Sequence, residues 1–157
     1  MAAFYFAYGS NMNPRRVSQR QMRYTEYFGG VLNDFRLVFN KRSVKYPGAA
    51  SANVVAAPGH RVEGVLYRLL DLQQIEVMDP FEGHPVRYSR LALPVYADNK
   101  PQHAWVYLAN DEWITEGLKP ARWYLNHLLE GEPHLSPDYF AALSRIECLP
   151  NSELEPD

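Results

Sequence analysis

The chain has 157 residues, about the length of one domain and enough to bury a core without disulfides or a metal. Its 46% hydrophobic and 22% charged residues are typical of a globular protein. The formal charge of -2 provides no overall attraction to nucleic acid or to an anionic membrane, so we expect neither as a partner.

Three features bear on the cellular compartment. The single cysteine, Cys148, cannot form an intrachain disulfide, which fits a reducing compartment, and we expect it to be inert packing. The first residues lack the basic region of a secretory signal. No apolar run approaches the roughly 18 residues that a membrane span needs. The sequence therefore predicts a cytoplasmic protein.

The first half of the chain is predicted to be mostly strands. Residues 3–7 are short and aromatic and are followed by Gly9, which is typical of a strand. Residues 14–23 are predicted to form a short helix with Asn13 as its N-cap. Residues 30–39 and 62–69 are two further strands, and the second is apolar on both faces, as in a strand that is buried on both sides or closed into a barrel.

A short helix and a hairpin are predicted next. The helix covers residues 71–79 and is expected to end at Pro80, because proline interrupts helical hydrogen bonding. Residues 86–96 and 103–109 are predicted strands, joined by a turn at 98–101.

The last third of the chain is predicted to be helical. One helix lies between Pro120 and Gly131, and Ser136 and Pro137 begin another. Strands followed by helices indicate an α+β fold in one domain, residues 1–150. The acidic tail, residues 151–157, lacks aromatic side chains and is expected to be disordered.

Several common catalytic patterns are missing from the sequence. Its five histidines show no metal-ligand spacing and there is no CxxC pair, so we expect neither a metal nor a cofactor. Glycine-rich phosphate loops and a GxSxG elbow are also missing. Four arginines (Arg15, Arg16, Arg20 and Arg23) cluster after residue 14. We expect a solvated helix face there, with attraction of an anionic substrate as the alternative.

The segment Tyr8-Gly9-Ser10-Asn11-Met12 joins the first strand to the first helix. Glycine, serine and asparagine allow a sharp turn that directs backbone N–H groups outward, and the following helix dipole adds to their effect. Such a loop can bind an anion. The alternative is a plain tight turn.

The segment 79–85 contains a second candidate group. Two prolines and a glycine predict a rigid, irregular loop, with Glu82 between Phe81 and Gly83. A carboxylate beside an aromatic ring can have a raised pKa and act as a base. The alternative is an exposed loop glutamate. Asp79 is a possible second carboxylate, although it more simply ends the helix, and His84 is an alternative base.

These segments together resemble the γ-glutamylcyclotransferase family. The YGSN loop of that family is found at Tyr8–Met12, and its E-G segment with a following tyrosine at Glu82-Gly83 and Tyr88. Further similar segments are Ala52-Asn53, Val62–Tyr67, Pro120, Tyr124, Glu130-Gly131, Leu135-Ser136-Pro137 and Tyr139. The resemblance covers about residues 4–146.

The sequence departs from the family pattern at three places. Ala121 follows Pro120 where the family has serine, which removes one polar contact to substrate, and His84 is polar where the family is often apolar. Asn11 differs from the leucine of the glutathione-specific branch, so glutathione is not the favoured substrate.

The resemblance implies a small mixed β-barrel flanked by helices, with one pocket where the first loop meets Glu82. It also implies release of 5-oxoproline and a free amine from a γ-glutamyl compound, with Glu82 as the catalytic base. Tyr8, Gly9, Ser10, Asn11 and Met12 would cradle the substrate, with their N–H groups on an oxyanion or on the α-carboxylate. Tyr88 and Tyr124 would close the pocket.

Other functions are compatible with the same resemblance. Some relatives remove a γ-glutamyl protecting group during antibiotic assembly, and others act on γ-glutamyl-ε-lysine. A module that binds a small acidic metabolite without turnover is a third possibility, although the carboxylate of Glu82 would hinder it. No feature of the sequence indicates an oligomeric state.

Overall fold

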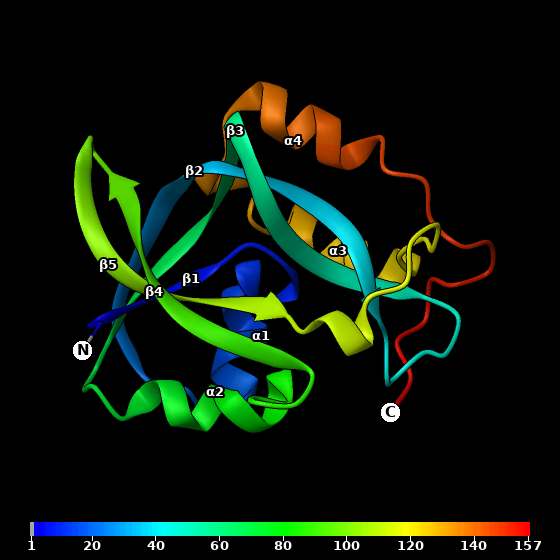
Figure 1. Ribbon diagram of the computed structural model, residues 1–157, viewed down its shortest axis with the longest axis horizontal. Helices are drawn as coiled ribbons and strands as arrows, with labels where there is room; N and C mark the ends of the chain where they lie inside the picture. Colours follow the sequence, from blue (N-terminus) through cyan, green and yellow to red (C-terminus); the bar gives the residue numbers. More distant parts are fainter. Residues whose placement is uncertain (1) are drawn as a thin grey trace.

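Five strands form a closed barrel in the computed structural model, which describes residues 2–157 (Figure 1). In chain order they are β1 (Phe4–Ala7), β2 (Tyr24–Arg42), β3 (Ala50–Leu69), β4 (Tyr88–Ala97) and β5 (Lys100–Ala109). The order around the barrel is β1-β3-β2-β4-β5. β1 and β5 are parallel and the other neighbours are antiparallel, which confirms the predicted mixed barrel.

Helices and short 3₁₀ turns flank the barrel, which confirms the α+β class. They are η1 (Ser10–Met12), α1 (Pro14–Gln19), α2 (Gln74–Glu82), η2 (Asp111–Trp113), α3 (Arg122–Leu129), η3 (Glu132–His134) and α4 (Pro137–Ser144). Both predicted N-caps are confirmed, because Asn13 accepts a hydrogen bond from the N–H of Arg15 and Ser136 accepts one from the N–H of Tyr139. Helix α1 is shorter than predicted and ends at Gln19.

Strands β2 and β3 are much longer than the sequence predicted. They form one long antiparallel hairpin whose register shifts between Asn33 and Phe35 and between Phe39 and Lys41. Each shift breaks the alternation of inward and outward side chains that reveals a strand in a sequence. The shorter β4–β5 hairpin turns at Asp98 and Asn99, whose φ angles of 50° and 62° match a two-residue hairpin turn.

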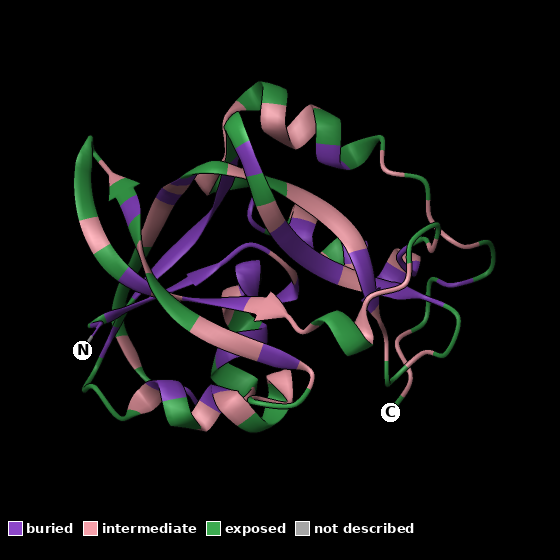
Figure 2. Cartoon of the chain, viewed as in Figure 1, coloured by how far each residue is buried: buried purple, intermediate pink, exposed green. Residues whose placement is uncertain are grey.

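The core lies on both sides of the barrel wall, and β1 contributes to both parts. Phe4 and Phe6 pack inside the barrel, whereas Tyr5 and Ala7 pack outside it against the helices. All four residues of β1 are buried (Figure 2), so this strand is a fixed base for the loop that follows it.

Helix α2 differs from the prediction at its C-terminal end. It continues through Pro80 to Glu82 and ends at Gly83, which has the left-handed φ of 68° that favours glycine. Proline lacks an N–H but keeps its carbonyl, and the carbonyl of Pro80 accepts the hydrogen bond from the N–H of Gly83 at 3.2 Å. Glu82 is therefore on a helix and not on an irregular loop.

The acidic tail also differs from the expected disordered segment. Ser152 is buried, and its carbonyl accepts a hydrogen bond from the N–H of Trp123. The carboxylate of Glu155 contacts Arg16 and Lys45 as well as His127. Ion pairs and hydrogen bonds hold the tail against the rest of the domain. The low hydrophobicity of the tail predicted disorder, because it does not indicate such polar contacts. No helix within residues 2–157 is long and apolar enough to span a membrane.

Candidate active site

A cavity of about 350 Å³ lies where β1 passes into η1. Its wall includes Tyr8, Gly9, Ser10 and Asn11 from this loop, Glu82 from the end of α2, Tyr88 from β4 and Tyr124 from α3. The structure thus brings together all but one of the residues that the sequence indicated, although they are separated by up to 116 positions in the chain.

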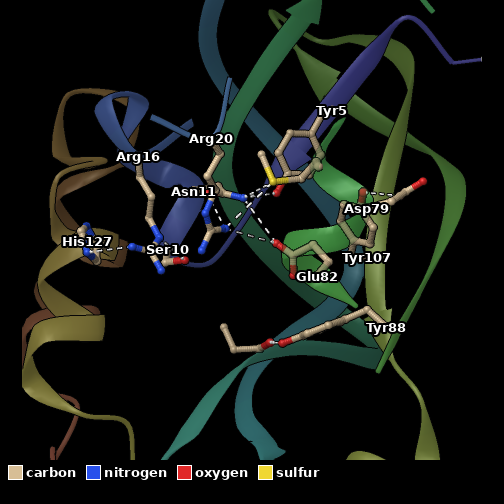
Figure 3. Close-up of polar contacts among 12 residues, drawn as sticks. Tyr5, Ser10, Asn11, Arg16, Arg20, Asp79, Glu82, Tyr88, Tyr107 and His127 are labelled. Atoms are coloured by element: carbon tan, nitrogen blue, oxygen red, sulfur yellow. Dashed lines mark hydrogen bonds and ion pairs between the residues drawn. The ribbon is translucent and has the colours of Figure 1, made fainter. Parts of the chain in front are cut away.

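Glu82 lies in this cavity beside the first loop (Figure 3). Its Oε1 atom is 3.4 Å from Nδ2 of Asn11 and 4.0 Å from Nη1 of Arg20, and its side chain is only 18% exposed. Burial raises the pKa of the Glu82 carboxyl above its usual value, although the positive charges of Arg20 and Lys41 oppose this shift. A buried carboxylate of this kind is suited to take up and return a proton.

Asn11 connects the loop to three other elements. Its side-chain amide donates to the hydroxyl of Tyr5 at 2.9 Å and accepts from Arg20 at 3.2 Å. Its carbonyl accepts a hydrogen bond from the hydroxyl of Tyr67 at 2.7 Å. These contacts fix the loop against β1, β3 and the end of α1, and they hold Asn11 beside Glu82.

Gly9 is needed in the loop because of the space around it. A Cβ atom at this position would be 3.0 Å from the hydroxyl of Tyr124 and 3.3 Å from the Cβ of Ala52. Its φ of -114° lies outside the left-handed region, so close approach explains the glycine better than the sharp turn that the sequence suggested.

Met12 is the predicted site residue that lies outside the cavity. Its side chain is fully buried in the core between the barrel and the helices, and its N–H donates to the carbonyl of Gly9 at 3.0 Å. Neither group is available to a ligand. The N–H groups of Ser10 and Asn11, at the start of η1, have no partner within that helix.

Tyr88 and Tyr124 both hold the backbone of Ala52 at the cavity wall. The hydroxyl of Tyr88 donates to the Ala52 carbonyl at 2.7 Å, whereas the hydroxyl of Tyr124 accepts from the Ala52 N–H at 2.9 Å. The hydroxyl proton of Tyr88 is therefore engaged in this hydrogen bond, whereas the hydroxyl proton of Tyr124 is available to a ligand. The hydroxyl of Tyr8 donates to the carbonyl of Tyr107.

The basic cluster after the first loop divides between solvent and cavity. Arg15 on α1 and Arg23 beyond its end are exposed, but Arg16 and Arg20 line the cavity. The guanidinium of Arg16 donates to Oγ of Ser10 at 3.1 Å. The four-residue spacing of these two arginines was the available signal, since it places them on the same face of a helix.

The cavity is also lined by three basic residues that sequence reasoning missed: Lys41, Lys45 and Arg87. They come from the end of β2, the segment after it and the segment before β4. None is part of a local motif, so only the folded barrel brings them together.

The alternative bases do not line the cavity. Asp79 accepts two hydrogen bonds from Arg90, at 2.9 and 3.1 Å, and one from Tyr107 at 2.7 Å. Burial opposes the shift, but these bonds lower the pKa of the Asp79 carboxyl. His84 also lies outside the cavity wall. In the part of the chain that the structure describes, no group of three or more His, Cys, Asp or Glu residues could hold a metal.

Comparison with known proteins gives both a family match and structural matches. The family model for gamma-glutamyl cyclotransferase, AIG2-like proteins matches residues 5–125, more than half of the chain. No curated protein matches the chain in sequence.

Three solved structures are similar over most of this chain. The crystal structure of uncharacterized protein loc79017 from Homo sapiens has 24% identity and a TM-score of 0.86, covering 99% of this chain and 94% of that one. A structure named Gamma-glutamyl cyclotransferase has 22% identity and a TM-score of 0.84, covering 100% and 95%. YkqA from Bacillus subtilis has 23% identity and a TM-score of 0.79, covering 92% and 53%. At these identities the likenesses show the shared fold.

Proposed function

The chain belongs to the gamma-glutamyl cyclotransferase, AIG2-like family, and on this basis we propose that it cyclises γ-glutamyl compounds to 5-oxoproline. The α-amine of the glutamyl group attacks its own γ-carbonyl carbon, and the bond from that carbon to the leaving nitrogen breaks. The lactam keeps one hydrogen on the attacking nitrogen, so the substrate ammonium loses two protons. The leaving nitrogen gains two protons and departs as an ammonium, and no water is consumed. The substrate carries both reacting groups, so holding them in a ring-forming pose supplies much of the acceleration.

The observation that carries this proposal is the position of Glu82. Within residues 2–157 it is the only acidic side chain that lines the cavity, and its raised pKa favours proton exchange. Glu82 takes each of these protons in turn from the attacking nitrogen and passes it to the leaving nitrogen. Asn11 holds the carboxylate toward the loop, where the rest of the glutamyl group would bind.

The first loop and helix α1 provide the cradle for the glutamyl group. The N–H groups of Ser10 and Asn11 and the guanidinium of Arg20 are donors for its α-carboxylate or for the oxyanion formed in the reaction. Nη1 of Arg20 lies 4.0 Å from Oε1 of Glu82. When the substrate ammonium pairs with Glu82, Arg20 becomes available to the carboxylate of the same substrate. The hydroxyl of Tyr124 adds a neutral donor at the wall.

Product analysis tests this function. Purified protein is incubated with a panel of γ-glutamyl amines and γ-glutamyl amino acids, and the products are identified by mass spectrometry. We expect 5-oxoproline and the free amine in equal amounts. When the reaction is run in water labelled in its oxygen, the 5-oxoproline should carry no labelled oxygen. Release of labelled glutamate would instead indicate hydrolysis and contradict the proposal. So would the absence of product from every substrate.

A further inference from the structure

Lys41 and Arg87 are two cations in the cavity wall that have no ion-pair partner within residues 2–157. Lys41 is only 5% exposed, and its Nζ lies 5.3 Å from the ring centroid of Tyr88 and 5.4 Å from that of Trp113. The guanidinium of Arg87 lies 6.0 Å from the same Trp113 ring. Aromatic rings contact both cations, and no carboxylate oxygen of the described residues lies within 4.0 Å of either charged group.

The other cations of the cavity wall do have acidic partners. Arg16 and Lys45 share the carboxylate of Glu155, at 2.9 and 2.7 Å, and Arg20 faces Glu82 at 4.0 Å. Five cations of the wall thus face two carboxylates, and two of the three excess positive charges lie at Lys41 and Arg87. Arg87 is half-buried, but Lys41 is buried, and a buried cation without a partner is costly, so this part of the wall favours an anionic ligand.

The glutamyl group does not supply that anion. It carries one ammonium and one carboxylate, which the cradle already matches with Glu82 and with Arg20 and the loop. Arg87 is placed on the leaving-group side, because its guanidinium packs so closely on Gly83 that a Cβ there would clash with it. Gly83 directly follows Glu82, the residue that must return a proton to the leaving nitrogen.

We infer that Lys41 and Arg87 form a second anion subsite, which binds a carboxylate carried by the leaving amine. The inference rests on the proposed function. It assigns γ-glutamyl amino acids, in which the leaving amine is an amino acid, as the preferred substrates over uncharged γ-glutamyl amines. Lys41 retains its charge at neutral pH, since burial and the neighbouring Arg87 lower its pKa to about 8 while Glu82 opposes this shift.

Two substrates that differ by one carboxylate test the subsite. They are γ-glutamyl-alanine and γ-glutamyl-ethylamine, and kcat/KM is measured for each by the release of 5-oxoproline. A site built around a charged group rejects the analogue that lacks it, so we expect the wild type to prefer γ-glutamyl-alanine by about 10- to 100-fold. Lys41→Met and Arg87→Met should each reduce this preference at least about tenfold.

Two control variants separate charge from packing. Lys41→Arg keeps the positive charge and should keep most of the preference. Lys100→Met makes the same chemical change at an exposed residue of the β4–β5 hairpin, outside the cavity wall, and should keep the full preference for γ-glutamyl-alanine. The melting temperature of each variant shows whether the fold is retained.

The possible failures are distinguishable. If the wild type releases 5-oxoproline from both substrates equally, or if Lys41→Met and Arg87→Met reduce both rates by the same factor, the subsite is refuted and the proposed function stands. If neither these substrates nor other γ-glutamyl compounds release 5-oxoproline, the proposed function fails and the subsite inference fails with it.

Discussion

The two tyrosines at Ala52 differ in the direction of their hydrogen bonds, and this predicts different roles. Tyr88 donates its proton to the Ala52 carbonyl, whereas Tyr124 accepts from the Ala52 N–H and keeps its own proton for the substrate. Burial raises the pKa of Tyr124 to about 12, so that proton stays in place at neutral pH.

Replacing each tyrosine by phenylalanine separates these roles. Tyr124→Phe and Tyr88→Phe each remove one hydrogen bond to the Ala52 backbone, so their structural cost is matched. Tyr124→Phe also removes a donor to the substrate, and we expect it to lower kcat/KM about tenfold more than Tyr88→Phe does, about the effect of one lost hydrogen bond. Equal losses in the two variants would show that both tyrosines only support the wall.

At the scale of single residues, the sequence indicated part of the cavity wall. Glu82 and Tyr8 to Asn11 stand in recognisable segments, and the structure places them around one cavity. Lys41 and Arg87 were not predicted, because a charged residue in a long strand or a connecting segment has no local pattern that reveals a buried environment. Met12 was predicted with its loop, although its fully buried side chain serves the core.

At the scale of elements, the turn from β1 into η1 depends on the small size of Gly9. A side chain there would meet Tyr124 and Ala52, which lie across the cavity wall. We expect Gly9→Val to abolish binding of 5-oxoproline measured by calorimetry, because the valine fills the space beside the loop and displaces Tyr124.

A graded variant controls for unfolding. Gly9→Ala adds a single methyl group, and its affinity for 5-oxoproline should fall between that of the wild type and that of Gly9→Val. Circular dichroism should show that both variants keep their secondary structure, because Gly9 lies at the cavity wall between β1 and η1 and in neither element. Unchanged affinity in folded Gly9→Val would mean that this loop does not contact the ligand.

The elements themselves were predictable where their signals are local. Caps at Asn13 and Ser136 and the hairpin turn at Asp98 and Asn99 follow from side-chain chemistry, and the structure confirms them. The end of α2 was placed too early, because the hydrogen bonds that continue the helix past Pro80 do not involve the missing proline N–H. The full lengths of β2 and β3 depend on pairing between distant segments.

At the scale of the whole molecule, Glu155 of the tail links two basic residues of the cavity wall, Arg16 and Lys45, to His127 of helix α3. Burial opposes the shift, but hydrogen bonds from His127, Lys45 and Arg16 lower the pKa of Glu155 from 4.5 to about 2. A carboxyl whose folded pKa is depressed stabilises the protein above its unfolded pKa and loses this effect as the pH falls toward the folded value.

Glu155→Gln tests this link between tail and domain. We expect the free energy of unfolding at pH 7 to fall by about 2 kcal/mol, the contribution of a charge-assisted hydrogen-bond group. The difference from wild type should shrink as the pH is lowered from about 4.5 toward 2, where Glu155 becomes protonated in both states. Glu153→Gln is the control, since Glu153 is exposed. If both variants unfold alike in denaturant at pH 7, the tail does not stabilise the domain.

The role of Glu82 as the catalytic base is tested by the single-turnover and steady-state rates of Glu82→Gln. Glutamine keeps the shape of the side chain and its contact with Asn11 but cannot accept the substrate proton. We expect kcat to fall by about 10²–10⁴-fold, the usual effect of losing a general base. Binding of 5-oxoproline should persist, because the cradle is intact. His84→Ala, which changes a neighbour outside the cavity wall, should retain activity within about threefold of wild type. A folded Glu82→Gln protein that still releases 5-oxoproline within about tenfold of the wild-type rate would contradict the assignment of Glu82 as the catalytic base.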